Sequence, residues 1–504
     1  MSRQAIETDV LVVGGGIAGI ATAERIAREA ARREKRIRLI LCEAESHLGS
    51  GASAGLEGWY HSGSLYAHAP DLSFTRGCMQ GLADLLKHYA FDQSFTRRTQ
   101  CNAQPFEIHS RTPTFNLSRA GWFRRPVDLL LPKSQPAEVS DRIRGAIGGL
   151  YFGYPWLNEQ GSIQEPAAPA PAVDRDGFDD MLRESGHADT LLATQQRLAN
   201  LRRETVGPAV DVECLPSLDM SMDTQLILSD LASHASGLGV EIRAGSRLTS
   251  WDGRTAGFVD SRGKSITITP KQCIFATGAA PIGGVTAPDF GPRAVLKRWT
   301  SVMVTVTPAL SPSCFVLLSN DRRLAFNHFC HTGANGDYSI IADANAAEGD
   351  LSQASIRAIA DRIREKARIW FGDHIKRRST RHHSCSKIEV SPCPSVARSY
   401  SVVCSPTGNR ANGSNELWVV PGKFSLFATL GETIHREMDR RGLYDSLAPG
   451  RATPHAFDRR KISVSKSAGL SLMHAQGRAT RDAYGTQRGG LQRGGTQRCQ
   501  IEPT

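Results

Sequence analysis

The chain has 504 residues, 40% of them hydrophobic, which is enough for two domains with sizeable cores. Its formal net charge is +11. From Arg451 onward ten basic side chains stand against three acidic ones, so most of the excess lies in this last segment and no nucleic-acid partner is expected.

No stretch approaches the ~18 apolar residues that a membrane span needs, and the polar N-terminal residues do not resemble a signal peptide. We therefore expect a cytoplasmic protein with no transmembrane segment. The eleven cysteines show neither C-x-x-C pairs nor zinc-ligand spacing. This pattern predicts free thiols and no metal site.

The first predicted unit is a strand over 9–13, a helix over 17–33 and a second strand over 38–42. A strand, a crossover helix and a strand form a right-handed parallel unit. The segment 47–63 is rich in glycine and serine and reads as a loop, followed by a helix over 73–89.

The pattern is irregular from 94 to 205 and becomes regular again near 210. Later helices are expected over 223–238, 352–371 and 428–440, and strands over 240–243, 246–251, 265–269, 273–277 and 416–420, with several more between 301 and 342. His382 and His383 stand among lysine and arginine residues and look like part of a solvated turn. After 446 the periodicity is lost, which predicts a disordered basic tail.

The first strand ends in the fingerprint Gly14-x-Gly16-x-x-Gly19. Gly14 permits a tight turn, Gly16 lets the backbone approach a pyrophosphate, and Gly19 lets the helix pack close to the sheet. Free N–H groups at the helix start attract phosphate. Glu43, after the second strand, is placed to bond ribose hydroxyls. The context predicts a dinucleotide site, without choosing between NAD and FAD.

Three further segments resemble the glycine-oxidase and D-amino-acid-oxidase-like flavoproteins, and more narrowly the FAD-dependent glycerol-3-phosphate and 2-hydroxyglutarate dehydrogenases. The first is a small-residue loop followed by a histidine motif. The second is a helix-strand pair leading to Ala-Thr-Gly, and the third resembles a Gly-Gly-Lys-x-Thr turn, with Pro421 in place of a glycine. These segments are 49–66, 239–278 and 417–425.

The resemblance implies FAD as the cofactor. It implies an α/β fold with a Rossmann-like FAD-binding domain assembled from discontinuous segments (8–93, 206–290 and 386–445). It also implies a mixed-sheet α+β substrate domain (94–205 and 291–385). The disordered basic tail (446–504) completes the chain. The residues it implies for FAD binding are Gly14, Gly16, Ile17, Ala18, Gly19, Glu43, Gly51, Ala52, Ser53, His61, Leu248, Ala276, Thr277, Gly278, Gly422, Lys423 and Phe424.

Four side chains are candidates for the chemistry. His61 matches a histidine that lies near the flavin in the family, and a histidine suits the removal of a hydroxyl proton. His328, with His331, ends a probable strand of the substrate domain. Arg398 matches an arginine that pairs with the substrate anion in the family, and Lys423 would stabilise a reduced, anionic flavin.

We expect an FAD-dependent dehydrogenase or oxidase that transfers a hydride to flavin N5 from an H–C–OH or H–C–NH centre of a small molecule. The sequence has no second G-x-G-x-x-G motif that would indicate an NAD(P)H site. Oxygen or a quinone is therefore the expected electron acceptor. Two alternatives stay open: a monooxygenase or tailoring enzyme that acts on a larger substrate, and a non-catalytic FAD-binding protein.

Overall fold

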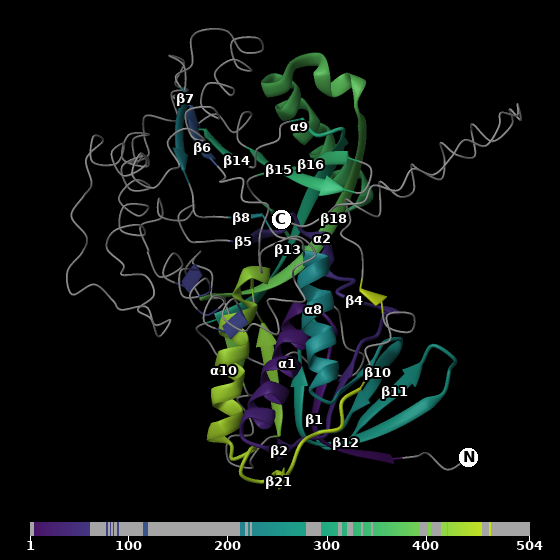
Figure 1. The fold of residues 1–504 in the computed structure, drawn as a ribbon. Coiled ribbons are helices and arrows are strands. Elements are labelled where there is room, and N and C mark those ends of the chain that lie inside the picture. Colours follow the sequence, from purple (N-terminus) through teal and green to yellow (C-terminus); the bar gives the residue numbers. More distant parts are fainter. Residues whose placement is uncertain are drawn as a thin grey trace, which may run out of the picture.

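The computed structural model describes two large sheets, one above the other in Figure 1, each with its own helices. The residues it describes are 5–60, 77–78, 81, 84, 88–89, 114–118, 212–216, 220–221, 224–278, 294–310, 315–319, 326–333, 336–343, 346–392, 402–404, 415–420, 422–455 and 463–464. The predicted helix over 73–89 and most of the irregular segment 94–205 lie outside them.

The first sheet has eight strands in the order β10-β11-β12-β1-β3-β9, with β20 beside β12 and β19 beside β20. Their bounds are β1 Ala5–Val13, β3 Leu39–Cys42, β9 Val240–Arg243, β10 Ser246–Trp251, β11 Ala256–Asp260, β12 Ser265–Phe275, β19 Val402–Cys404 and β20 Glu416–Val420. Parallel pairing joins β20, β12, β1, β3 and β9. Their carboxyl ends therefore meet at one edge of the sheet.

Residues 265–275 form one strand, β12, where two strands over 265–269 and 273–277 were expected. Pro270 and Lys271 break the apolar pattern, yet β12 continues through them beside β1. On its other side β12 pairs with β11 up to Ile268 and with β20 from Cys273. Pro270 falls between these two partners, so its missing N–H removes no hydrogen bond from either ladder.

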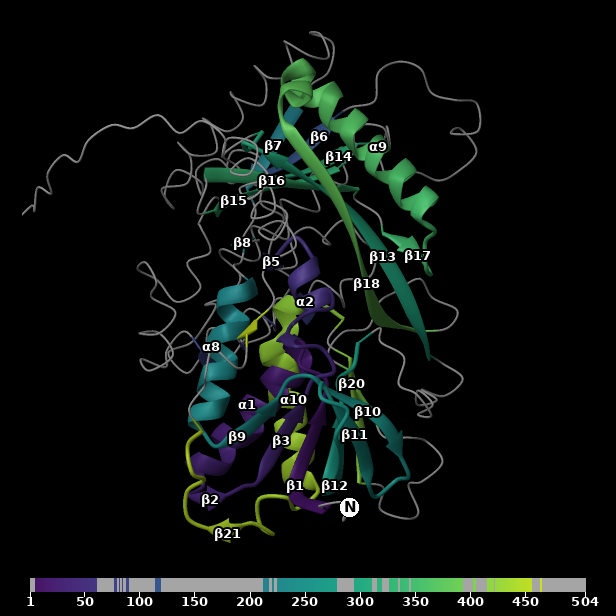
Figure 2. The same ribbon diagram turned by 90° about the vertical axis from the view of Figure 1, so that its right-hand side faces the viewer.

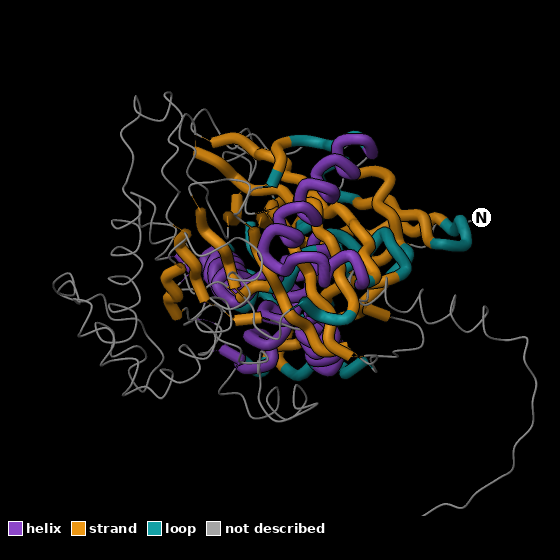
Figure 3. Tube along the Cα trace, turned by 90° about the horizontal axis from the view of Figure 1, so that it is seen from above, coloured by secondary structure: helices purple, strands orange, loops and turns teal. Residues whose placement is uncertain are grey.

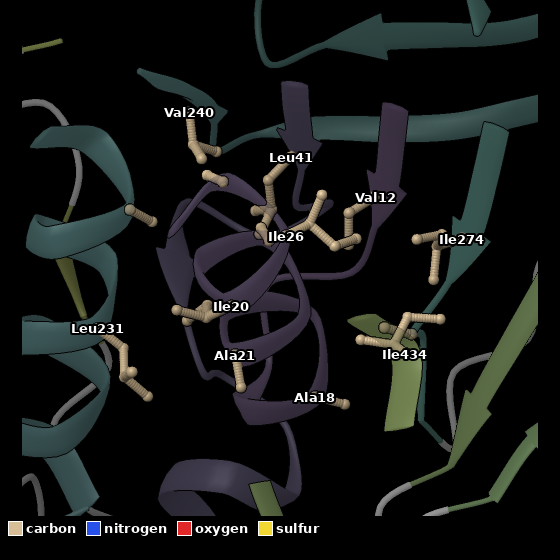
Figure 4. Packing of buried hydrophobic residues seen from close by; sticks show 14 of the residues in the cluster. Val12, Ala18, Ile20, Ala21, Ile26, Leu41, Leu231, Val240, Ile274 and Ile434 are labelled. Atoms are coloured by element: carbon tan, nitrogen blue, oxygen red, sulfur yellow. The ribbon is translucent and has the colours of Figure 1, made fainter. Parts of the chain in front are cut away.

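Three helices cover one face of this sheet: α1 (Ile17–Arg32), α8 (Thr224–Gly237) and α10 (Phe427–Arg440). Figure 4 shows α1 packed beside the sheet and α8, with Ile20, Ile26 and Leu231 among the packed side chains. The β10–β11 hairpin contributes Leu248 and Phe258 to a core on the other face. The parallel strands are therefore buried on both faces, as their continuous apolar sequence predicts.

The second sheet is mixed and runs in the order β17-β13-β16-β15-β14-β6-β7, with β18 beside β13. Its bounds are β6 Thr114–Ser118, β7 Val212–Pro216, β13 Ala294–Thr307, β14 Phe315–Ser319, β15 Phe326–Gly333, β16 Gly336–Asp343, β17 Ala347–Glu348 and β18 Ser379–Pro392. The helix α9 (Gln353–Phe371), followed by the 3-10 helix η5 (Gly372–Arg377), lies against it (Figures 2 and 3).

Strand alternation gives the second sheet two chemically different faces. Val302, Val304 and Ile341 pack under α9. The residues between them, such as Met303 and Thr305, point to the opposite face. We call this opposite face the inner face, because it contacts the short helix α2 (Ala52–Gly55) and the residues after it, which belong to the first fold unit.

Two sequence-based expectations need correction. His382 and His383 do not lie in a solvated turn but in the first half of β18, which pairs with β13 along all its length. The 14-residue strand has few apolar residues, so its sequence gave no alternating pattern. Residues 446–455 also pack against the first unit, where β21 (Ala448–Pro449) pairs with β2 (Lys35–Arg36) and His455 N donates to Ser236 O.

Three two-stranded pairings complete the described elements: β2 with β21, β4 (His47–Leu48) with β22 (Ser463–Val464), and β5 (Trp59–Tyr60) with β8 (Met220–Ser221). We propose the division into an FAD-binding and a substrate domain along the two sheets. On that basis the second domain extends from β6 to β7 and from β13 to β18, so its boundaries lie after Pro216 and Pro392 rather than at 205 and 385.

A buried ionic network joins α1 to α10. The Glu29 carboxylate accepts hydrogen bonds from Arg32 at 2.6 Å and from Arg33 at 2.8 Å, and only 3% of its side chain is exposed. Arg25 bonds both Glu29 and Glu432 of α10. Burial alone would raise the pKa of Glu29, but the arginine hydrogen bonds outweigh burial and lower it to about 2.

We therefore expect Glu29→Gln to lower the free energy of unfolding by about 3 kcal/mol, because the buried Arg25 and the partly buried Arg33 each lose one of their two carboxylate partners. Urea unfolding at neutral pH measures the loss. Since the pKa of Glu29 falls from 4.5 to about 2 on folding, its contribution is present above pH 4.5 and is lost as the pH falls toward 2.

The control is Glu365→Gln on α9, because Glu365 also pairs with an arginine but is exposed to solvent. Its loss should leave the stability nearly unchanged, because an exposed ion pair contributes little. Equal losses in the two variants would contradict a special role for the α1 network.

Candidate FAD site

The glycine turn lies where the carboxyl ends of three strands meet. Gly14 N donates to Cys42 O at the end of β3, and Ala276 N donates to Val13 O at the end of β1, both at 2.8 Å. Gly14 has a φ of +111°, and a Cβ placed on it would lie 2.5 Å from Ala276 O. Only glycine fits there, because both the backbone conformation and the close approach exclude a side chain.

Gly19 and Gly16 have different surroundings. A Cβ on Gly19 would lie 1.9 Å from Gly14 O, so this glycine sets how closely α1 packs against the turn. A Cβ on Gly16 would meet only Ser53 Oγ, at 3.2 Å. The space beside Gly16 is therefore open, as close approach by a pyrophosphate requires.

The start of α1 offers backbone N–H groups to this space. Ile17 N donates to Ser53 Oγ at 2.9 Å, which fixes α2 against the helix start. The first N–H groups of a helix have no partner within the helix, so those of Ala18 and Gly19 are donors for an anion. The positive end of the helix dipole favours the same ligand.

Glu43 is held rigidly at the end of β3. One carboxylate oxygen accepts from Gly15 N at 2.5 Å and the other accepts from Glu45 N at 2.8 Å. Ser246 N also donates to Glu43 O at 2.7 Å, which brings the start of β10 to the same point. Leu248 lies two residues further along β10, so the predicted ribose and adenine positions are neighbours.

The remaining predicted positions among the described residues lie around the same edge of the sheet. Gly51 opens α2 and, like Gly278 after β12, would have nothing within 4 Å of an added Cβ. Ala276 and Thr277 follow β12, next to β20 in the sheet. Gly422, Lys423 and Phe424 follow β20 and lead into the 3-10 helix η7 (Phe424–Leu426).

These residues fit FAD. Open backbone at Gly16, Gly51 and Gly278 leaves room for the pyrophosphate, the start of α1 supplies donors, and Glu43 supplies an acceptor. They lie just beyond the carboxyl ends of the parallel strands, next to β1. In the sheet β1 has β3 on one side and β12 on the other. Open α/β sheets bind their ligands at such a point.

The sequence model of the DAO family of FAD-dependent oxidoreductases matches residues 9–403. The chain belongs to this family. It is an enzyme family that depends on FAD, so FAD is the cofactor of this flavoprotein. The predicted family, fold class and cofactor are confirmed.

The fold resembles that of an FAD-dependent oxidoreductase from Pseudomonas aeruginosa, with a TM-score of 0.51, 15% identity, and coverage of 94% of this chain and 100% of that one. Glycine oxidase from Geobacillus kaustophilus matches with a TM-score of 0.47 and 14% identity, covering 92% and 99%. L-α-glycerophosphate oxidase from Mycoplasma pneumoniae gives 0.47 and 12%, covering 89% and 98%. No curated protein sequence shows significant similarity.

None of the helices described has both the length and the apolar character that crossing a bilayer requires. Within the same residues, no group of three or more histidine, cysteine or acidic side chains is arranged to hold a metal ion.

Two of the four catalytic candidates of this DAO-family chain lie among the described residues. His61 and Arg398 lie outside the described residues. Lys423 is half-buried in the turn after β20. His328 is fully buried on the α9 side of β15, where its Nε2 lies 2.8 Å from Ser339 Oγ and its ring contacts Phe371. That position suits a structural role, because it faces away from the inner face.

Sequence reasoning missed Ser425, assigned His383 to a solvated turn, and named His331 only together with His328. His331, three residues after His328, lies on the inner face and its Nε2 is 3.0 Å from Glu57 O. His383 lies on the same face of β18 and bonds the backbone of Gly55. Ser425 is fully buried in η7, and its Oγ has no partner within the described part of the chain. The Lys-x-Ser spacing after β20 was the one signal for Ser425.

The glycine geometry predicts different effects of two similar substitutions, one on FAD binding and the other on stability. Gly16→Ala should leave the fold intact but lower FAD retention severalfold, because its methyl group would occupy the space left for the pyrophosphate. Gly14→Ala should destabilise the whole protein, because it forces a β-carbon against Ala276 O at a φ of +111°.

The ratio of flavin to protein absorbance measures FAD retention, and thermal unfolding of the apoprotein measures stability. Gly263→Ala, in the β11–β12 turn with nothing within 4 Å of its added Cβ, is the control for positive φ. Full FAD retention in Gly16→Ala would show that the pyrophosphate lies elsewhere.

Proposed function

We propose that this DAO-family enzyme oxidises a small molecule at an H–C–OH or H–C–NH centre, with the substrate held between the FAD site and the inner face of the second sheet. The observation that carries this proposal is His383, a buried and uncharged base on that face beside the α2 segment that borders the FAD site. When FAD is bound, it supplies the hydride acceptor at flavin N5.

The protonation state of His383 follows from its surroundings. Burial lowers its pKa to about 4, so the ring is neutral at pH 7. The ring bonds the Gly55 backbone, while its Nδ1 has no partner within the described residues. In a neutral imidazole one nitrogen donates and the other accepts. Nδ1 is therefore available to accept a hydrogen bond from the hydroxyl group of an alcohol substrate.

The inner face also provides a surface that excludes water. Met303, Phe329, Ile340 and Ala342 form an apolar floor, with at most 2% of each residue exposed. His331, Asn327 and His383 stand on the same face and keep partial exposure. Ligand sites commonly combine an apolar lining with a few polar groups that fix orientation.

Three sequence-based assignments remain part of the proposal. His61 is the second candidate for the proton acceptor, and Lys423 the candidate for stabilising negative charge on the cofactor. Oxygen or a quinone is the proposed electron acceptor.

Anaerobic mixing of the purified holoenzyme with hydroxy acids, amino acids and polyol phosphates tests the function. One of these classes should bleach the flavin absorbance, and failure of all of them would contradict the proposal.

Once a bleaching substrate is known, His383→Gln should slow flavin reduction by about 100-fold, the usual contribution of a general base, without loss of FAD. His382→Gln is the matched control, because His382 lies next in the strand but on the α9 side, near Arg364. The same slowing in His61→Gln, with none in His383→Gln, would move the role of base to His61.

A further inference from the structure

The C-terminal arm, residues 448–455 and 463–464, lies beyond the part of the chain that matches the family model. The sequence predicted a disordered tail here, yet these residues contact the first fold unit at several places. β21 pairs with β2, which follows α1. His455 N donates to Ser236 O near the end of α8, at 2.9 Å. The described arm is therefore part of the folded unit.

The arm packs tightly against the turn between α8 and β9. Gly239 in this turn has a φ of +91°, and a Cβ on it would lie 2.5 Å from Ala452 Cβ and 3.1 Å from Thr453 O. A side chain at this position would collide with the arm, so the glycine is what allows the close approach. The contact fixes the position of the arm at the end of α8.

The last described strand of the arm lies beside β4. β22 pairs with β4 in parallel, with Ser463 opposite His47 and Val464 opposite Leu48, and Figure 1 shows it as the short yellow arrow next to β4. Among the described residues these two strands form a separate two-stranded sheet. Isolated two-stranded sheets are only marginally stable, so β4 depends on β22 to keep its position.

β4 and the residue after it pack against the glycine turn. Leu48 is fully buried, and a Cβ on Gly15 would lie 2.7 Å from its Cδ2. Gly49 N donates to Gly15 O at 2.8 Å, and Gly49 O accepts from Ala54 N of α2 at 3.1 Å. A Cβ on Gly49 would lie 2.6 Å from Leu228 Cδ1 of α8. The loop that contains β4 therefore fills the space between the glycine turn, α2 and α8.

The residues that this loop contacts border the space assigned to FAD. Gly15 lies between Gly14 and Gly16 and donates to Glu43, and α2 begins just after Gly51. A bound molecule leaves a closed site when the site opens locally, and the contacts that close the site determine how often it opens. Loosening the loop would therefore loosen two borders of the pyrophosphate space.

We infer that the C-terminal arm is a cofactor-positioning part of the FAD site, because the pairing of β22 with β4 holds the loop 47–49 against the glycine turn and slows the release of FAD. The arm acts through the residues that border the cofactor. The inference concerns FAD binding alone, so it goes beyond the proposed reaction and does not depend on the identity of the substrate.

The double substitution Ser463→Pro/Val464→Pro tests the pairing in the full-length holoenzyme. Proline has no N–H to donate, so it weakens the ladder with β4. FAD release should become about 10-fold faster, the worth of one or two backbone hydrogen bonds, as measured by the rise of flavin fluorescence after dilution. In the apoprotein, hydrogen exchange at Gly49 N should also become faster, because its bond to Gly15 O opens more often.

Gly239→Ala tests the anchoring of the arm independently and decides the inference if the proline variant does not fold. Its methyl group should displace Ala452 and speed FAD release severalfold. Gly253→Ala, in the β10–β11 turn, is the matched control, because its φ is +90° and nothing lies within 4 Å of its added Cβ. It should release FAD at the native rate. Adding Ala452→Gly to Gly239→Ala removes the atom that the methyl group meets and should slow release again.

Two results would overturn the inference. One is release of FAD at the native rate from the proline variant, even with a lower melting temperature of the apoprotein, because the arm would then have a structural role only. The other is equally fast release from Gly239→Ala and Gly253→Ala, because backbone strain alone would then explain the effect.

Discussion

The close approach of backbone at Gly14 and Gly19 is the constraint on which the rest of the structure depends. A Cβ on Gly19 would lie 1.9 Å from Gly14 O, and one on Gly14 would lie 2.5 Å from Ala276 O. These contacts fix the start of α1 against the ends of β1 and β12. The helix start, with its free N–H groups, is thereby aimed at the point where the strand ends of the first sheet meet.

The helix that carries this site is held by charge as well as by apolar packing. Glu24 is fully buried in α1 and bonds His234 of α8 at 2.8 Å, while Glu29 and Arg25 connect α1 to α10. Gly431 of α10 allows the two helices to approach, because an added Cβ would lie 3.2 Å from Arg25 Cβ. Breaking one partner of such a network leaves a buried charge, so these ion pairs favour one arrangement of the helices over others.

The first sheet and its cofactor site could be predicted from the sequence because their signals are local. A buried strand, a glycine turn and a helix follow one another within 9–33, and close backbone contacts determine their arrangement. The second sheet offered no such local signal. β18 is rich in polar residues and exists because it pairs with β13 over 14 positions, a contact between segments about 80 residues apart. Only the tertiary pairing makes His383 a strand residue.

The same pairing decides which of two neighbouring histidines can take part in chemistry. In β15, His328 points under α9 and bonds Ser339, whereas His331 points to the inner face and meets Glu57. In β18, His382 meets Arg364 of α9, whereas His383 meets Gly55 beside the FAD site. Successive strand residues alternate between faces, so a shift of one residue in register would exchange these environments. The long pairing of β13 with β18 therefore does more than build the domain: it fixes which polar groups of β18 face α2 and which face α9.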